Sequence, residues 1–267
     1  MKLTFLGTGA ADYPADRSGD DGSPFYMRRY SSLLVDGRLL IDPGPHIYDF
    51  EEKLGTPGMF RDVTDVLLTH THRDHFSPLS LERLCAEAGD GHEVRFFADR
   101  HAFPKLGATL PGNLLTLPVT ATSEFDAGEY SVMPCRSNHA LYFTGEQTLN
   151  YIVRDGKTGH SFFYGADSGW IVYDTWQLIK KAKPEAVIFE ATVGDFTPGD
   201  DRIFGHTSVP MIGLMMETII KQQATADGCA FYATHMARTL HGTHEQTAAS
   251  LAPYGVVPAF DGMTIEV

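Results

Sequence analysis

The feature that most constrains this chain is the segment Thr69–His75, which reads Thr-His-Thr-His-Arg-Asp-His. It directly follows a short apolar run with the pattern of a buried strand. Alternate side chains of an extended segment point to the same side, so His70 and His72 can reach one metal ion, and a turn can direct Asp74 and His75 at a second. Imidazole with carboxylate suits zinc, manganese or iron. A polar surface loop with three chance histidines is the alternative, but such a density is rare outside metal sites.

The composition narrows the class of protein. Twelve histidines among 267 residues are an excess that indicates metal or acid-base chemistry. A net charge of -13 would repel a polyanion, because nucleic-acid affinity rests mostly on neutralised phosphates. A long RNA or DNA substrate is therefore disfavoured. No apolar run approaches the length of a membrane span, so we expect a soluble globular body without a membrane partner.

Two features of the sequence bear on its compartment. The apolar stretch in residues 1–7 is too short for a signal peptide and is interpreted as a first strand. Cys85, Cys135 and Cys229 are odd in number and far apart, which argues against a disulfide framework. We therefore expect a reducing compartment, with the cytoplasm as the default.

The chain is interpreted as one domain spanning residues 1–267, because no repeat, low-complexity segment or long linker divides it. Residues 10–30 form a long loop without periodicity, and such loops are often functional. Helices are predicted at 46–54, from Ser77-Pro78 to Gly89, and at 172–182, 208–223 and 244–251. Short runs rich in Val, Ile, Phe and Tyr predict strands at 2–6, 31–35, 38–41, 65–69, 93–97, 113–118, 129–135, 148–153, 160–164, 185–190, 228–233 and 261–266. This alternation indicates sheets covered by helices.

Three further metal-type side chains follow predicted strands. His139, Asp167 and His235 come after the strands at 129–135, 160–164 and 228–233. Each alone would more often be a turn or capping residue than a ligand. Together they occupy strand ends, where sheet folds commonly assemble their sites. His235 is favoured over the nearby His241 and His244, because only His235 directly ends a strand.

At this point the chain resembles the metallo-β-lactamase superfamily, and within it the phosphodiesterase branch. It looks most like the phosphoribosyl cyclic-phosphate phosphodiesterases, and ribonuclease Z is a more distant relative. The fold that the resemblance implies is an α/β four-layer αββα sandwich. The residues that carry the resemblance are Leu6–Gly9, Ile41–Gly44, the His-x-His-x-Asp-His core, His139, Asp167, Glu190–Thr192, Gly205–Ser208, Thr234-His235 and Phe260–Met263.

The resemblance also assigns roles, with two divalent ions, Zn²⁺ or Mn²⁺, as cofactors. It implies His70, His72 and His139 as ligands of the first ion, Asp74, His75 and His235 as ligands of the second, and Asp167 as a bridge between them. Asp74 is counted as a catalytic residue as well as a ligand. Asp42 would orient a ligand from outside, although a simple turn residue before Pro43-Gly44 is an equal reading of the sequence.

The mechanism expected from two ions is attack on phosphorus by a metal-bridging hydroxide. His206 is the candidate proton donor for the departing alkoxide, because it matches the histidine of the family's Gly-His-Thr-Ser segment. It also precedes a predicted helix whose first N–H groups suit a phosphate oxygen. Without the resemblance, His206 would more often be a helix-flanking polar residue. Glu190 would hold the His206 ring or be only a carboxylate at a sheet end.

The chain departs from the family in its early loop. Related cyclic-phosphate phosphodiesterases carry a cysteine-rich accessory zinc site there, whereas this chain has no cysteine before Cys85. Arg28 and Arg29 lie in this loop instead, either to bind a substrate phosphate or as a solvated edge. No long basic insertion resembles the tRNA-holding arm of ribonuclease Z, so a small-molecule phosphodiester is expected, bound by a monomer or a homodimer.

Two other functions stay open from the sequence. The same pair of ions could hydrolyse a thioester, lactone or lactam by attack on a carbonyl carbon. A non-catalytic metal-binding or carrier protein is the alternative outside enzymes, but the intact ligand set argues against it.

Overall fold

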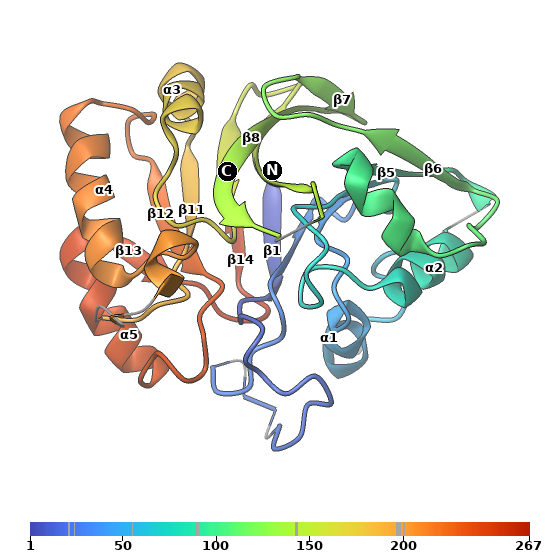
Figure 1. Cartoon of the computed structure of the whole chain (residues 1–267), viewed down its shortest axis with the longest axis horizontal. Helices are drawn as coiled ribbons and strands as arrows, with labels where there is room; N and C mark the ends of the chain where they lie inside the picture. Colours follow the sequence, from blue (N-terminus) through green and yellow to red (C-terminus); the bar gives the residue numbers. More distant parts are fainter. Residues whose placement is uncertain are drawn as a thin grey trace.

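The computed structural model describes residues 1–20, 22–23, 25–54, 56–88, 91–141, 144–195, 199 and 201–267. In this part of the chain two seven-stranded sheets lie between outer helices (Figure 1). Three apolar clusters fill the spaces between the resulting layers: one between the sheets and one beneath the helices on either side. The α/β four-layer sandwich predicted from the sequence is confirmed.

The first sheet and its helices come from the first half of the chain, except for β14, which is the last strand of the whole chain. Its strands lie in the order β14 (Thr264–Glu266), β1 (Lys2–Gly7), β2 (Ser32–Val35), β3 (Leu39–Ile41), β4 (Asp65–Leu67), β5 (Val94–Ala98) and β6 (Leu114–Pro118). Helices α1 (Ile47–Leu54) and α2 (Pro78–Glu87) and the 3₁₀ helix η2 (Arg100–Leu106) belong to the same half. Because β14 pairs with β1, the two chain ends lie side by side near the middle of Figure 1.

The second sheet takes most of the remaining chain. Its strands lie in the order β13 (Val256–Pro258), β12 (Ala230–Thr234), β11 (Ala186–Glu190), β10 (Ser161–Gly165), β9 (Gln147–Asp155), β8 (Tyr130–Ala140) and β7 (Phe125–Ala127). The helices of this half are α3 (Tyr173–Ala182), α4 (Val209–Lys221), α5 (His244–Leu251), η3 (Asp201–Phe204) and η4 (Ala252–Tyr254).

The alternation of side chains along β1 shows why this chain forms layers. Leu3 and Phe5 are buried between the sheets, whereas Leu6 packs beneath the helices of the first half. Both faces of the strand are therefore apolar, as expected for a sheet covered on both sides. Each of the predicted strands overlaps an observed strand, with ends that differ by a few residues.

The sequence missed or misplaced a few elements. Strands β7 and β13 were not predicted, because acidic residues lie on both sides of Phe125 in β7 and β13 ends at Pro258, which weakens a strand pattern. Strand β8 runs to Ala140, past a register irregularity that begins at Arg136, so His139 lies inside the strand and not after it. Helix α2 has the predicted cap, Ser77, but ends at Glu87, and the predicted end at Gly89 lies outside the described residues.

The topology brings several strand ends to one edge of the molecule. Strands β10, β11 and β12 are parallel to one another, and β8 shares their direction because both β8 and β10 run antiparallel to β9. The carboxyl ends of all four strands therefore meet at one edge. Strand β4 of the first sheet delivers the segment Thr69–His75 to the same place, as the contacts below show. None of the described helices is long and apolar enough to cross a membrane.

Candidate metal centre

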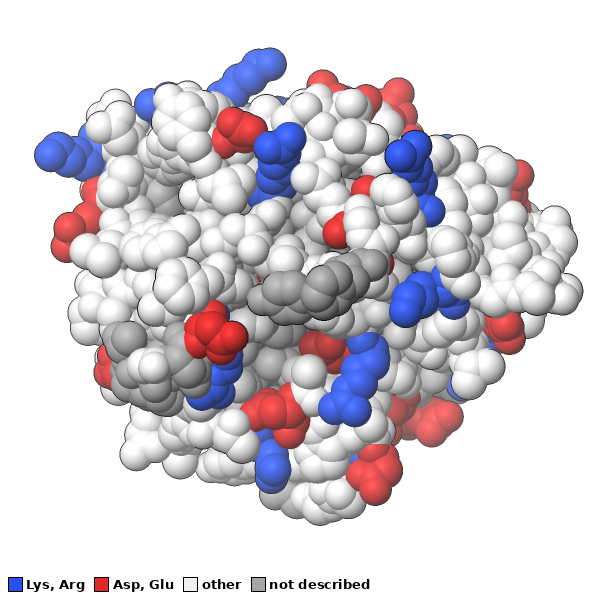
Figure 2. Space-filling view, viewed as in Figure 1, with Lys and Arg blue, Asp and Glu red and all other residues white. Residues whose placement is uncertain are grey.

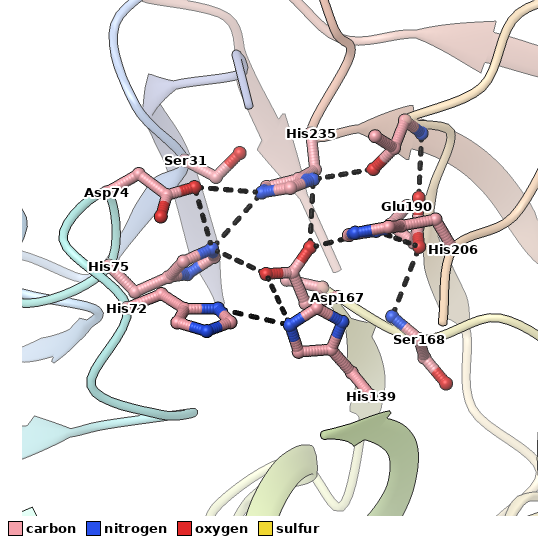
Figure 3. A network of polar contacts seen from close by, with 12 residues as sticks. Ser31, His72, Asp74, His75, His139, Asp167, Ser168, Glu190, His206 and His235 are labelled. Carbon is pink, nitrogen blue, oxygen red and sulfur yellow. Dashed lines mark hydrogen bonds and ion pairs between the residues drawn. The ribbon is translucent and has the colours of Figure 1, made fainter. Parts of the chain in front are cut away.

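The structure brings the seven predicted metal ligands together. They fall into two groups of four that share Asp167, and within each group the ligand atoms all lie within 4.8 Å of one another. Figure 3 shows most of these side chains converging on Asp167 from both sheets. The first group is His70, His72, His139 and Asp167, and the second is Asp74, His75, Asp167 and His235.

Nitrogen atoms face one another in the first group, which we call group one. His72 Nδ1 lies 2.9 Å from His70 Nε2 and 3.1 Å from His139 Nε2. Asp167 Oδ2 lies 3.1 Å from His70 Nε2 and 3.8 Å from His139 Nε2. Donors about 2 Å from one shared ion would have this spacing.

The second group, group two, has the same spacing around another centre. His235 Nε2 lies 3.1 Å from His75 Nε2 and 3.3 Å from Asp74 Oδ2. Asp167 Oδ2 lies 3.1 Å from His75 Nε2 as well as from His70 Nε2, so one oxygen of this carboxylate faces both groups. That is the arrangement expected of a bridging carboxylate.

Backbone turns at the strand ends aim these side chains. Asp42, Asp167 and His235 have φ values of 61°, 45° and 55°, in the left-handed region that residues other than glycine rarely adopt. Asp42 directly follows β3, Asp167 comes two residues after the end of β10, and His235 directly follows β12. Strained backbone of this kind clusters at functional sites, where the surrounding structure holds it in place.

The protonation states of Asp167 and His70 favour metal binding. Burial disfavours charge on Asp167, but His235, His139 and His75 around it hold the pKa of its carboxyl well below the usual range. Burial, together with the neighbouring His75, lowers the pKa of His70 well below its usual value. An ionised carboxylate and a neutral imidazole are the forms that bind a cation.

His75 differs from these two residues. Burial lowers the pKa of His75, but the carboxylates of Asp74, Asp167 and Asp42 outweigh this effect and raise it well above its usual value. An ion bound there therefore has to displace a proton.

The donor set therefore fits a pair of divalent ions. Ring nitrogens about 3 Å apart repel each other through their lone pairs unless a proton or a cation lies between them. Asp167 Oδ1 is buried and accepts no hydrogen bond from the described residues, although His235 Nδ1 lies 3.0 Å away. Imidazole nitrogens and carboxylate oxygens are ligands of zinc and manganese.

Outer side chains fix the rings of group two. Asp42 Oδ2 lies 2.8 Å from His75 Nδ1, while its Oδ1 accepts hydrogen bonds from the backbone N–H and hydroxyl of Thr69. The Thr192 hydroxyl lies 2.8 Å from His235 Nδ1. Asp42 thus contacts the ring of a predicted ligand, as an orienting residue would, and is more than a turn residue. The roles of Thr69 and Thr192 were missed, although a threonine directly before the core motif was visible in the sequence.

His206 lies at the edge of the cluster, on the side of Glu190. Its Nδ1 is 3.2 Å from Glu190 Oε1 and 3.4 Å from Asp167 Oδ1, which leaves Nε2 for other contacts. Burial lowers the pKa of His206, but the Glu190 carboxylate outweighs this effect and raises it to about 9. Glu190 also accepts hydrogen bonds from the backbone N–H groups of Ser168, Thr192 and Thr207. Both sequence readings of Glu190 therefore apply: it holds the ring and it caps the sheet end.

A cavity of about 450 Å³ opens beside the cluster. Three residues of the early loop, Ala10, Ala11 and Asp12, form part of its wall. Asp12 accepts hydrogen bonds from the backbone N–H groups of Arg238 and Thr239, so its carboxylate ties this loop to the segment after His235. Besides the metal-centre residues and the loop, the cavity is lined by Arg73, Thr192, Arg202, Ala237, Thr239 and Leu240.

Two expectations about phosphate binding were wrong. Arg28 and Arg29 are 3% and 6% exposed, and neither lines this cavity. Arg28 donates to the Thr8 hydroxyl and the Ala259 carbonyl, and Arg29 pairs with Asp49 and Asp261, so both fix the end of the early loop.

The start of helix α4 is also closed to a phosphate. The N–H of Val209 donates to the Gly194 carbonyl, Pro210 has no N–H, and Met211 donates to the Ser208 hydroxyl. The first donors of the helix are therefore absent or occupied within the described chain.

The other histidines near the end of the chain lie outside both groups. His241 Nε2 lies 2.5 Å from the Ala191 carbonyl, and His244 Nδ1 accepts a hydrogen bond from Arg28. Each ring thus has a structural partner. Of the three candidates near the end of the chain, His235 is the one that joins a ligand group, as the sequence favoured.

Comparison with known proteins agrees with this geometry. Residues 37–248 match the family model of the β-lactamase superfamily domain. No curated protein matches the chain.

Several solved structures share the fold. Zn²⁺-bound PqqB from Methylobacterium extorquens is 18% identical with a TM-score of 0.74, and the match covers 100% of both chains. Yeast PDE1 is 14% identical with a TM-score of 0.73, over 100% of this chain and 99% of that one. The short form of human tRNase Z is 20% identical with a TM-score of 0.67, over 100% of this chain and 99% of that one.

Proposed function

The chain belongs to the metallo-β-lactamase superfamily of metal-dependent hydrolases, and on that premise we propose that it is a phosphodiesterase for a small or cyclic phosphodiester. Asp167 and the two ligand groups would hold two divalent ions, zinc or manganese. Such a pair supplies a water of lowered pKa and positive charge for in-line displacement at phosphorus.

The observation that carries this proposal is the position of His206. Hydrolysis of a phosphodiester breaks a bond from phosphorus to an oxygen, and an alkoxide leaving group must take up a proton as it departs. His206 lines the cavity next to Asp167, with its Nδ1 held by Glu190. This contact fixes the ring and favours its protonated form, with Nε2 as the nitrogen that donates. A thiolate leaving group would need no such donor.

The proposed substrate is small. A cavity of about 450 Å³ is in the range of pockets for small molecules. Basic and acidic side chains are interspersed over the face in Figure 2, which shows no broad basic surface of the kind that tracks a nucleic-acid backbone. One structural neighbour is named a tRNase, but here the net charge of -13 favours a small phosphodiester.

The test uses the full chain loaded with zinc or manganese and screened against cyclic phosphates, linear phosphodiesters, thioesters, lactones and lactams. We expect two ions per chain by elemental analysis and turnover of a phosphodiester. Turnover confined to carbonyl substrates would replace the proposal with the thioester, lactone or lactam reading. Fewer than two ions and no hydrolysis would favour a carrier.

A further inference from the structure

The segment that carries His70 and His72 has a second face. Because side chains alternate along an extended segment, Thr71 points away from the side where His70 and His72 converge. The structure shows what Thr71 contacts there: Glu146, which directly precedes strand β9 of the second sheet.

Glu146 binds Thr71 through both carboxylate oxygens. Its Oε1 accepts a hydrogen bond from the Thr71 backbone N–H at 2.7 Å, and its Oε2 accepts one from the Thr71 hydroxyl at 2.5 Å. The carboxylate is nearly buried, with 8% of the residue exposed. Nearby, the Leu149 N–H donates to the Thr69 carbonyl, so strand β9 and the residue before it hold this segment at two points.

His72 needs such support more than the other histidines of the centre. The second ring nitrogen of His70 contacts the Thr69 hydroxyl, that of His139 the Gly205 carbonyl, and those of His75 and His235 contact Asp42 and Thr192. The Nε2 of His72 has no hydrogen bond from the described residues, and its ring is partly exposed.

A histidine ring without an outer partner depends on its backbone for its position. Two χ angles separate that backbone from the ligand nitrogen, so a shift at residue 71 or 72 moves His72 Nδ1 directly. Glu146 is the side chain that fixes residue 71.

We propose that Glu146 is a positioning residue for the ion of group one. It contacts no ligand side chain, but through Thr71 it holds His72 where Nδ1 can meet His70 and His139. Its effect is selective, because the histidines of group two have their own side-chain partners, Asp42 and Thr192. The inference rests on the two-ion site of the proposed function.

The experiment measures zinc affinity of the full chain by competition with a chromogenic chelator, alongside the absorption spectrum of the Co²⁺-loaded protein. In Glu146→Ala we expect one of the two zinc ions to bind about 10- to 100-fold more weakly, the range for loss of an outer partner, while the other keeps its affinity. The Co²⁺ absorption of one site should change with it.

A conservative variant separates positioning from charge. In Glu146→Gln the amide oxygen can accept from the Thr71 N–H, and the amide nitrogen can donate to the Thr71 hydroxyl. We therefore expect near wild-type affinity for both ions. Thr71→Val keeps the backbone contact but loses the hydroxyl. Its affinity for the weakened zinc ion should lie between those of Glu146→Ala and Glu146→Gln.

Glu51 offers a matched control. It is also a nearly buried glutamate that accepts backbone N–H bonds, from Gly58 and Met59, but it lies on α1 away from the metal centre. Glu51→Ala should lose stability without losing zinc affinity.

Wild-type affinity for both ions in Glu146→Ala would overturn the inference, as would equal weakening of both ions or the same loss in Glu51→Ala. If Glu146→Ala does not fold, Thr71→Val decides, and unchanged affinity there overturns the inference. Fewer than two ions in the wild-type protein would instead overturn the two-ion proposal itself.

Discussion

The two ligand groups differ in how deeply they are buried and in what holds them. In group two, Asp74, His75, Asp167 and His235 are all buried, and both histidines have hydrogen-bonded side-chain partners. In group one, His72 and His139 are partly exposed. Among the described residues, none donates to or accepts from His72 Nε2, so the outer support of this ring comes through the backbone at Thr71.

The difference indicates that the two groups have different roles, one in binding an ion tightly and one in leaving room for substrate. A buried group with fixed rings is preorganised, so little reorganisation is required when an ion binds. A group that opens toward the cavity leaves room for substrate and is more sensitive to changes in the surrounding chain. We therefore expect group two to hold its ion more tightly, and the following predictions test that contrast.

The largest effect is expected from the side chain that both groups share. Asp167→Ala removes the bridging carboxylate, so both ions should be weakened and activity should fall by about 1000-fold or more, which is several kcal/mol of transition-state stabilisation. Metal content and kcat/KM would be measured together. As a control, Asp174→Ala changes an exposed aspartate of α3 and should leave both values unchanged. Loss of only one ion would mean that Asp167 belongs to one group.

His206→Ala should come next. Loss of a proton donor lowers the rate by about 100- to 10,000-fold for a substrate with an alkoxide leaving group. A nitrophenolate leaving group needs no proton, so the same variant should cleave a nitrophenyl phosphodiester at nearly the wild-type rate. Both ions should stay bound. An equal loss with both leaving groups would refute the proton-donor role.

Asp42→Ala should act mainly on group two, because Asp42 contacts His75 directly but reaches His70 of group one only through the Thr69 hydroxyl. Without this carboxylate, His75 and the Thr69 N–H lose a buried partner, and one ion should bind about 10- to 100-fold more weakly. Chelator competition on this variant and on Glu146→Ala should each show one weakened ion, and the double variant should show both weakened. If the two single variants affect the same ion, the groups are not independently supported.

The smallest effect is expected from Thr192→Val. It removes one hydroxyl beside His235 Nδ1 at nearly constant volume. A single neutral hydrogen bond contributes about 1 kcal/mol, so the affinity of the group-two ion should fall by about 5-fold. The group-two ion should still bind more tightly than the group-one ion. A larger loss of affinity than in Asp42→Ala would show that the position of His235, and not that of His75, determines how tightly this ion binds.

Much of the fold could be predicted because its signals are local. The alternation of β1 involves only neighbouring residues of the sequence, and so does the Ser77-Pro78 start of α2. The acidic neighbours of Phe125 obscure the pattern of β7, and Pro258 obscures that of β13. The extension of β8 past Arg136 depends on its partner β9.

The sequence alone also singled out the residues that the structure brings together in the candidate metal centre. Density and spacing marked the His-x-His-x-Asp-His segment, and strand ends together with the family order marked His139, Asp167 and His235. Such residue types in such a pattern have few other uses. That their ligand atoms lie within 4.8 Å of one another in each group is shown only by the folded chain.

Only the tertiary structure decided how those residues are supported. Arg28 and Arg29 looked available for phosphate but are buried by the fold, and the first donors of α4 are occupied by Gly194 and Ser208. Glu146 stands 75 positions from Thr71 in the chain, so nothing local pairs them. A ligand can be identified from its chemistry and its neighbours in sequence, whereas an outer partner is set by which distant segments the two sheets bring into contact.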